Sequence, residues 1–276
     1  MLDYYNKRLN EYEAIYSKPE RQADLRTLVA KLQTDVSNRE VLEFACGTGW
    51  WTQRLATYAA SWTATDADPA ALDIVKHKAI QGLSSTQTLN AYQPNFSTSV
   101  DCVLAAHWYS HLKLNECSIF FRSVHSCLKP GGHLILLDNN FVSGSSTEIS
   151  RTDIEGNTYQ TRKLKDGSLH EVLKNFPSHQ QLVTNAEPYF KNFEFNNTLT
   201  LNTTYYFGTP RCKGLGKTQD THQTAIALPR RLSPCFELPR KLFSATRHIS
   251  PKASAAWLDQ SCSGPSPTLR TSSFFS

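Results

Sequence analysis

The stretch VLEFACGTGWWT, residues 41–52, decides the fold. It begins with a short, mostly apolar run that is typical of a buried strand, and Gly47 and Gly49 follow in a turn that leads into a helix. Glycine has no Cβ, so the backbone N–H groups of such a turn can approach a ligand closely. A strand, a glycine turn and a helix in this order predict a ligand site at the carboxyl edge of a parallel sheet.

Strands and helices alternate on both sides of this turn. We expect strands at 41–45, 61–66, 86–90, 101–106 and 133–138, and helices within 17–33, near 50–58, from Pro69 and over 117–128. Because parallel strands need right-handed helical crossovers, the pattern predicts a Rossmann-like, doubly wound α/β fold with a mostly parallel sheet and helices on both faces.

The alternation changes after residue 138. Asp166-Gly167 joins two strand-like runs, so we expect residues 141–176 to form an inserted β-hairpin flap over the carboxyl edge of the sheet. Ser178 and Gln181 have the spacing of a capping box and predict the start of another helix. Residues 193–207 alternate like two late strands, which predicts an antiparallel pair that closes the sheet.

The C-terminal quarter has a different composition. Residues 210–276 hold seven of the 13 prolines, ten serines and no sustained periodicity, which is typical of disorder. Ten of the 29 basic and three of the 24 acidic residues lie there, so the tail carries +7 and residues 1–209 carry −2. We therefore expect one domain over 1–209 and a basic tail over 210–276, which is either a contact arm for nucleic acid or inert.

The rest of the composition excludes several classes of protein. No apolar run approaches the roughly 20 residues that span a bilayer, and the first residues lack the pattern of a signal peptide. Seven irregularly spaced cysteines favour reduced thiols, and we expect a cytoplasmic protein. None of the cysteines and histidines has metal-site spacing, so we predict no metal.

The turn suits some ligands better than others. Thr52 stands where the dinucleotide fingerprint requires its third glycine, which disfavours NAD and similar dinucleotides. Asp66 ends the next predicted strand, 17 residues after Gly49, where a carboxylate can accept both hydroxyls of a ribose. The alternative role, capping a helix that begins at Pro69, is already served by Asp68.

Five segments together resemble the class I S-adenosylmethionine-dependent methyltransferases: VLEFACGTGWWT, TATDADPAAL, LNAY, VDCVLAAHWYSHL and LKPGGHLILLD. The resemblance spans roughly residues 4–207 and implies a seven-stranded sheet that binds S-adenosyl-L-methionine. It places Glu43, Ala45, Gly47 and Gly49 beneath the methionine part of the cofactor, Asp66 on the ribose, and Ala67, Asn90 and Ala91 at the adenine. Asn90 replaces the usual aspartate, but its side-chain oxygen can still accept from the adenine amino group.

The acceptor side is predicted from the residues after the fourth strand. His107 is the candidate general base, since histidine titrates near neutral pH; a structural histidine is the alternative. The N-terminal tyrosines resemble the aromatic lid of small-molecule members of the family, or they pack in the core. The candidates for the substrate pocket are Tyr5, Tyr12, Trp108, Tyr109, His111 and Arg162.

The sequence therefore predicts methyl transfer to a small molecule by in-line displacement, with no membrane partner. A methyltransferase for RNA or protein, recruited by the basic tail, is the first alternative. A non-catalytic protein that binds the cofactor or a partner is the second.

Overall fold

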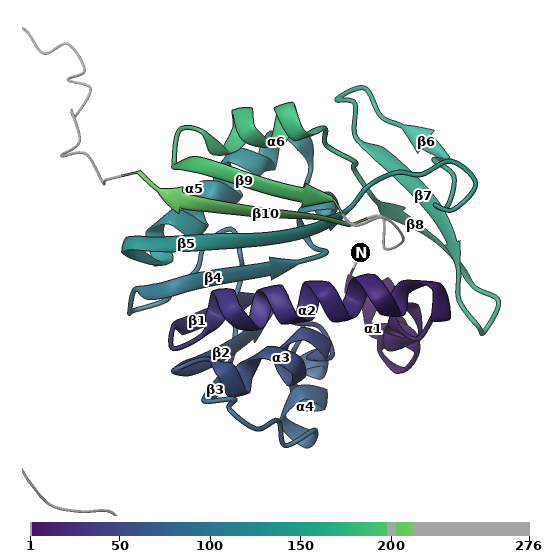
Figure 1. Cartoon of the computed structure of the whole chain (residues 1–276). Helices are drawn as coiled ribbons and strands as arrows, with labels where there is room; N and C mark the ends of the chain where they lie inside the picture. The colour runs from purple at the N-terminus through teal and green to yellow at the C-terminus, as the bar shows by residue number, and fades with distance from the viewer. Residues whose placement is uncertain (1, 198–202, 212–276) are drawn as a thin grey trace, which may run out of the picture. The chain divides into compact units, whose positions relative to one another are not determined.

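The computed structural model describes residues 2–197 and 203–211, and its centre is a seven-stranded sheet (Figure 1). The strand order is β3-β2-β1-β4-β5-β10-β9. The first five of these strands run parallel, and β10 pairs antiparallel with both β5 and β9. Their bounds are β1 Glu40–Phe44, β2 Ser61–Asp66, β3 Ser85–Thr88, β4 Val100–Ala106, β5 Leu128–Asn139, β9 Phe190–Asn197 and β10 Thr203–Pro210.

Helices cover both faces of the sheet, as the sequence predicts. One hydrophobic cluster joins one face to α2 (Gln22–Val36), α3 (Trp50–Leu55) and α4 (Pro69–His77). A second cluster joins the other face to α5 (Cys117–Cys127) and α6 (His179–Ala186). Along β1, Val41 belongs to the first cluster while Leu42 and Phe44 belong to the second, so both faces of this central strand are buried.

The N-terminal segment precedes this core. It consists of α1 (Leu2–Arg8) and two 3₁₀ helices, η1 (Leu9–Tyr16) and η2 (Pro19–Arg21). Further short 3₁₀ helices are η3 (Ala56–Tyr58), η4 (Tyr109–His111) and η5 (Leu114–Glu116). No helix of the described residues is both long and apolar enough to cross a membrane.

The flap predicted over 141–176 forms a three-stranded antiparallel sheet of its own. Its strands are β6 (Arg151–Thr152), β7 (Thr158–Lys163) and β8 (Leu169–Leu173), and Gly167 in the β7–β8 turn has a φ of +86°. Tyr4 of α1 packs against Leu164 and Val172 of the flap. The flap and α1 thus lie together at the carboxyl end of the parallel strands (Figure 1).

The structure shifts several predicted boundaries. The strand expected at 86–90 ends at Thr88, so Asn90 lies in a loop. The strand expected at 133–138 begins at Leu128, which pairs with Val100 before a register shift, so the Lys129–Gly132 turn lies inside β5. The capping box of Ser178 and Gln181 is present. From residue 212 on, the predicted tail lies outside the described residues.

A buried carboxylate sits beneath the glycine turn. The side chain of Glu43, in β1, accepts hydrogen bonds from the Thr52 hydroxyl (2.5 Å) and the Trp62 indole N–H (2.9 Å), and the residue is 1% exposed. Burial raises the pKa of this carboxyl to about 7. Glu43 therefore ties β1 to α3 and β2 from inside the core.

Replacing Glu43 with Gln should change how stability depends on pH. The pKa of this carboxyl is higher in the folded than in the unfolded protein. Its contribution to the free energy of unfolding is therefore fully present below the unfolded pKa and is lost as pH rises through about 7. The Glu43→Gln variant lacks this dependence and should gain about 2 kcal/mol relative to wild type between pH 5 and pH 8. Urea unfolding at both pH values measures the gain, with the exposed Glu20→Gln as control. If the free energies of unfolding of Glu43→Gln and wild type differ by the same amount at pH 5 and pH 8, the prediction is contradicted.

Candidate active site

The glycine turn holds three residues in the left-handed region of φ. These are Ala45 at +51°, Gly47 at +54° and Gly49 at +79°. Ala45 adopts a conformation that costs a residue with a Cβ about 1 kcal/mol. A Cβ built on Gly47 would find only the Tyr12 ring, at 4.0 Å, so this glycine faces open space. The backbone at 45–47 is thus shaped for close approach by a ligand.

Two residues predicted beneath the cofactor, Gly49 and Glu43, contribute to packing. A Cβ on Gly49 would lie 2.9 Å from the Val75 side chain, so this glycine lets the turn pack on α4. Glu43 points into the core toward Thr52 and Trp62. Neither residue lines a cavity next to the turn. Their predicted contact with the cofactor stays a prediction.

Asp66 closes the turn from β2. Its carboxylate accepts from the Gly47 N–H and the Asp68 N–H, both at 2.9 Å, and burial raises its pKa. Asp68 caps α4 by accepting from the Ala70 N–H at 2.9 Å, as predicted. The second oxygen of Asp68 is buried and has no hydrogen-bond partner among the described residues. An acceptor in this state calls for a donor from a ligand or water.

A cleft of about 360 Å³, here called the turn cleft, opens beside these residues. Asn90 and Ala91 line it, and the Asn90 side-chain oxygen accepts from the Tyr92 N–H at 2.9 Å. That oxygen keeps one lone pair for a ligand. Of the predicted cofactor residues, the cleft brings together Ala45, Gly47, Asp66, Ala67, Asn90 and Ala91.

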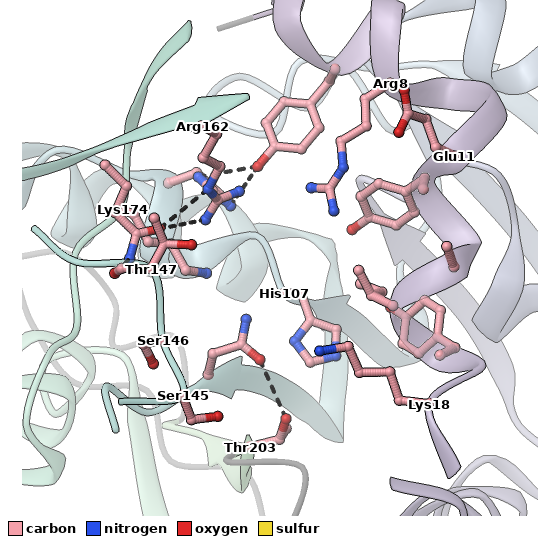
Figure 2. A pocket seen from close by; sticks show the side chains of 18 of the residues that line it. Arg8, Glu11, Lys18, His107, Ser145, Ser146, Thr147, Arg162, Lys174 and Thr203 are labelled. Carbon is pink, nitrogen blue, oxygen red and sulfur yellow. Dashed lines mark hydrogen bonds between the residues drawn. The ribbon is translucent and has the colours of Figure 1, made fainter. Parts of the chain in front are cut away.

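A larger cavity of about 550 Å³, here called the flap cavity, lies between the N-terminal segment, the flap and the end of β5. Figure 2 shows side chains from these elements around it. The two cavities share four lining residues: Tyr5, Tyr12, His107 and His111. These four side chains therefore lie where the two cavities adjoin, here called the junction.

His107 occupies the junction in a strained conformation. Its φ is +59°, and its N–H donates to the Leu137 carbonyl at 2.7 Å. The imidazole Nδ1 is buried and has no partner among the described residues. Burial lowers the pKa of this ring to about 4, so it is neutral near pH 7. The unpartnered ring nitrogen of this neutral histidine is available to accept a proton or a hydrogen bond.

His111, a predicted pocket residue, lines both cavities and also joins two parts of the fold. Its Nδ1 lies 2.7 Å from the Leu173 carbonyl and therefore donates, which leaves Nε2 to accept from the Tyr5 hydroxyl at 2.8 Å. Burial lowers the pKa of the imidazole and raises that of the Tyr5 phenol. Both ring nitrogens are thus occupied, and His111 ties the N-terminal segment to the flap.

Of the four N-terminal tyrosines, two lie where a lid over the site would lie and two are packed in hydrophobic clusters. Tyr5 and Tyr12 line both cavities, where a lid would lie. Tyr4 is 4% exposed and belongs to the small cluster with the flap. Tyr16 is 7% exposed and stacks on Trp50, with ring centroids 4.0 Å apart.

The remaining predicted pocket residues lie in different places. Arg162 lines the flap cavity. Trp108 lines the turn cleft and packs between Tyr92 and Phe120. Tyr109 is 1% exposed, packs on Phe120 and lines neither cavity. Tyr109 does line a separate cavity of about 280 Å³ beside α6, and its predicted pocket role stays a prediction.

Sequence reasoning missed the polar group beside the histidines. Asp138 lies one residue before the end of β5 and accepts from both the N–H (2.6 Å) and the hydroxyl (2.7 Å) of Ser110. Lys174, 4% exposed, lies 3.3 Å from the same carboxylate. Although burial raises the pKa of Asp138, Lys174 and the neighbouring groups hold it below its ordinary value. The position of Asp138 at the carboxyl end of a predicted strand was the available signal.

Comparison with known proteins identifies the fold. Residues 41–132 match the family model described as a methyltransferase domain, and no curated protein matches the chain. The DhpI–SAH complex is 23% identical, with a TM-score of 0.62 over 77% of this chain and 96% of its own.

Two further solved structures are similar at lower identity. An S-adenosylmethionine-dependent methyltransferase from Clostridium acetobutylicum is 15% identical, with a TM-score of 0.56 over 74% of this chain and 98% of its own. The amino pentose methyltransferase CalS10 from Micromonospora echinaspora is 17% identical, with a TM-score of 0.52 over 72% and 96%. Residues 41–132 are thus similar to a methyltransferase domain, and the chain shares the fold of solved S-adenosylmethionine-dependent methyltransferases.

Proposed function

We propose that the chain transfers a methyl group from S-adenosyl-L-methionine to a small molecule. The observation that carries this proposal is the meeting of two cavities at Tyr5, Tyr12, His107 and His111. The turn cleft holds the cofactor, the flap cavity holds the acceptor, and the methyl group passes between them at the junction. In-line displacement needs this arrangement, because the two reacting atoms must be aligned and shielded from water.

The residues of the turn cleft fit this cofactor. Asp66 is placed to accept from the ribose hydroxyls, and the unpartnered oxygen of Asp68 provides a further acceptor in the same wall. Under this proposal Asn90 and Ala91 meet the adenine edge, and Ala45 and Gly47 meet the methionine part; all four line the turn cleft. The bound cofactor supplies a methyl group activated by a positively charged sulfur.

The same cleft does not suit a dinucleotide. None of its lining residues is Lys or Arg, while Asp66 and Asp68 are both acidic. Thr52, at the position of the third fingerprint glycine, uses its hydroxyl to bond Glu43. The helix after the turn has only six residues, which leaves little dipole to stabilise a diphosphate. A ligand with a cationic end is favoured over a dianionic one.

His107 is the proposed general base. An acceptor hydroxyl or amine loses its proton as the new bond to carbon forms, and the free Nδ1 of His107 is the nearby group that can take it. The products are the methylated acceptor, S-adenosylhomocysteine and one proton, which His107 returns to solvent. Tyr5 and Tyr12 cover the junction and exclude water.

A small molecule fits the flap cavity better than a macromolecule does. About 550 Å³ lies within the usual range of small-ligand sites. The flap and the N-terminal segment are tied together over this space by the Tyr5–His111–Leu173 bonds. The structurally similar CalS10 is described as an amino pentose methyltransferase, which supports a small acceptor.

Asp66→Ala should weaken cofactor binding at least tenfold. The change removes charge-assisted bonds to the ribose, each of which is worth about 1.5–3 kcal/mol. Calorimetric titration of the full chain with S-adenosylmethionine, S-adenosylhomocysteine and NAD measures this. Asp66→Asn keeps one oxygen for the backbone bonds, and Asp73→Ala, on the exposed side of α4, serves as the matched control. Binding of NAD alone would overturn the assigned cofactor.

His107→Asn should reduce turnover by about 10²-fold while leaving the affinity for S-adenosylhomocysteine unchanged. Asparagine tolerates the left-handed φ, so the backbone strain is matched. Because the pKa of His107 is lowered to about 4, wild-type turnover should be constant above pH 5 and fall below it. Release of S-adenosylhomocysteine measures the turnover of His107→Asn and the pH dependence of wild-type turnover, with the exposed His77→Asn as control. Wild-type turnover in His107→Asn would make His107 a structural residue.

A further inference from the structure

The two cavities carry opposite charges. The lining of the turn cleft contains two Asp and neither Lys nor Arg. The lining of the flap cavity contains one acidic residue, Glu11, and six basic ones: Arg8, Lys18, Arg21, Arg162, Lys163 and Lys174. A cavity with this balance favours an anionic ligand, because its walls concentrate positive potential.

Arg162 is fixed in position without being neutralised. Its Nε and Nη2 donate to the Gln160 side-chain oxygen at 3.2 and 2.7 Å. Gln160 is 2% exposed, and its own Nε2 donates to the Thr147 carbonyl, which fixes the amide orientation. Because the partner is a neutral amide, the guanidinium keeps its full charge and further N–H donors. No described carboxylate forms an ion pair with it.

Arg8 approaches the same space from α1. Its guanidinium carbon lies 5.4 Å from the Tyr12 ring centroid and 5.8 Å from that of Tyr4. Burial raises the pKa of Tyr12, and the charges of both Arg8 and Arg162 oppose that rise, so the two cations act on one lid residue. Figure 2 shows Arg8 and Arg162 at the same cavity as His107, from separate elements.

Lys174 differs from these two arginines. It is paired with Asp138 at 3.3 Å and bonded to the Ser110 hydroxyl. Its charge is therefore balanced inside the protein, whereas those of Arg8 and Arg162 have no acidic partner in the described part of the chain. Two guanidinium groups without an acidic partner at one cavity favour binding of an anion from outside.

We propose that the methyl acceptor carries an oxyanion group, phosphoryl or carboxylate, which Arg162 and Arg8 bind while the atom to be methylated lies at His107. This inference rests on the proposed function, since it names the acceptor class of the same site. Guanidinium groups match the geometry of oxyanions through paired N–H donors. Arg162 and Arg8 then position the acceptor, and the junction at Tyr5 and Tyr12 completes its alignment with the cofactor.

The carboxylate of the cofactor itself is the competing ligand for these cations. Lys18 and Arg21 line the same cavity, together with Trp51 of the helix that follows the glycine turn. Arg162 belongs to the flap, on β7. A titration performed with S-adenosylhomocysteine already bound fills the cofactor site, so that any anion binding then reports the acceptor site alone.

The test is calorimetric titration of the full chain, saturated with S-adenosylhomocysteine, with three compounds of one carbon skeleton. Glycerol 3-phosphate and glycerate carry the two oxyanions, and glycerol is the neutral control. We expect at least one anion to bind and glycerol not to bind. Arg162→Gln and Arg8→Gln should each weaken anion binding about tenfold or more. Lys165→Gln, an exposed flap variant outside the cavity, should not change it.

Each outcome decides the proposal. Phosphate binding without glycerate binding assigns a phosphoryl acceptor, and the reverse assigns a carboxylate. Equal anion affinity in wild type and both arginine variants would overturn the inference. So would the absence of anion binding to a chain that binds S-adenosylhomocysteine. The proposed function would stand in both cases. If S-adenosylhomocysteine fails to bind, the proposed function fails, and the same anion titration without it still decides whether the arginines bind an oxyanion.

Discussion

The buried pair of Lys174 and Asp138 is the interaction on which the site depends. Lys174 follows the last flap strand and Asp138 lies in β5, and their side chains are 4% and 6% exposed. Placing both charges in the interior costs several kcal/mol per ion, which is recovered only through close contacts such as those with Ser110. Losing one partner would leave a buried charge alone, so the flap must stay on the sheet.

The same contacts fix the histidine loop. Ser110 lies between His107 and His111 and gives Asp138 both its N–H and its hydroxyl. Asn175, next to Lys174, donates its backbone N–H to the Ser110 carbonyl at 2.7 Å and its side-chain N–H to the Leu112 carbonyl at 2.8 Å. The flap thus shapes the junction between the cavities as well as covering one of them.

The parts of this site that are local in sequence could be predicted, and the parts made by long-range contacts could not. Gly47 and Asp66 were visible because a turn and a strand end determine where their backbone and carboxylate lie. Glu43 was assigned to the cofactor through the family resemblance, and the sequence does not show that its side chain bonds Thr52 and Trp62 in the core. The sequence did not single out Lys174, because its partner, Asp138, is 36 residues away.

The opposite charges of the two cavities fit one reaction. Under the proposed function, a cofactor with a positively charged sulfur occupies the acidic turn cleft and an anionic acceptor occupies the basic flap cavity. Their charges attract across a junction whose shared side chains, two tyrosines and two histidines, are neutral at pH 7. Neutral walls do not screen that attraction as water does. The charge pattern therefore draws the two reactants toward each other where the methyl group passes.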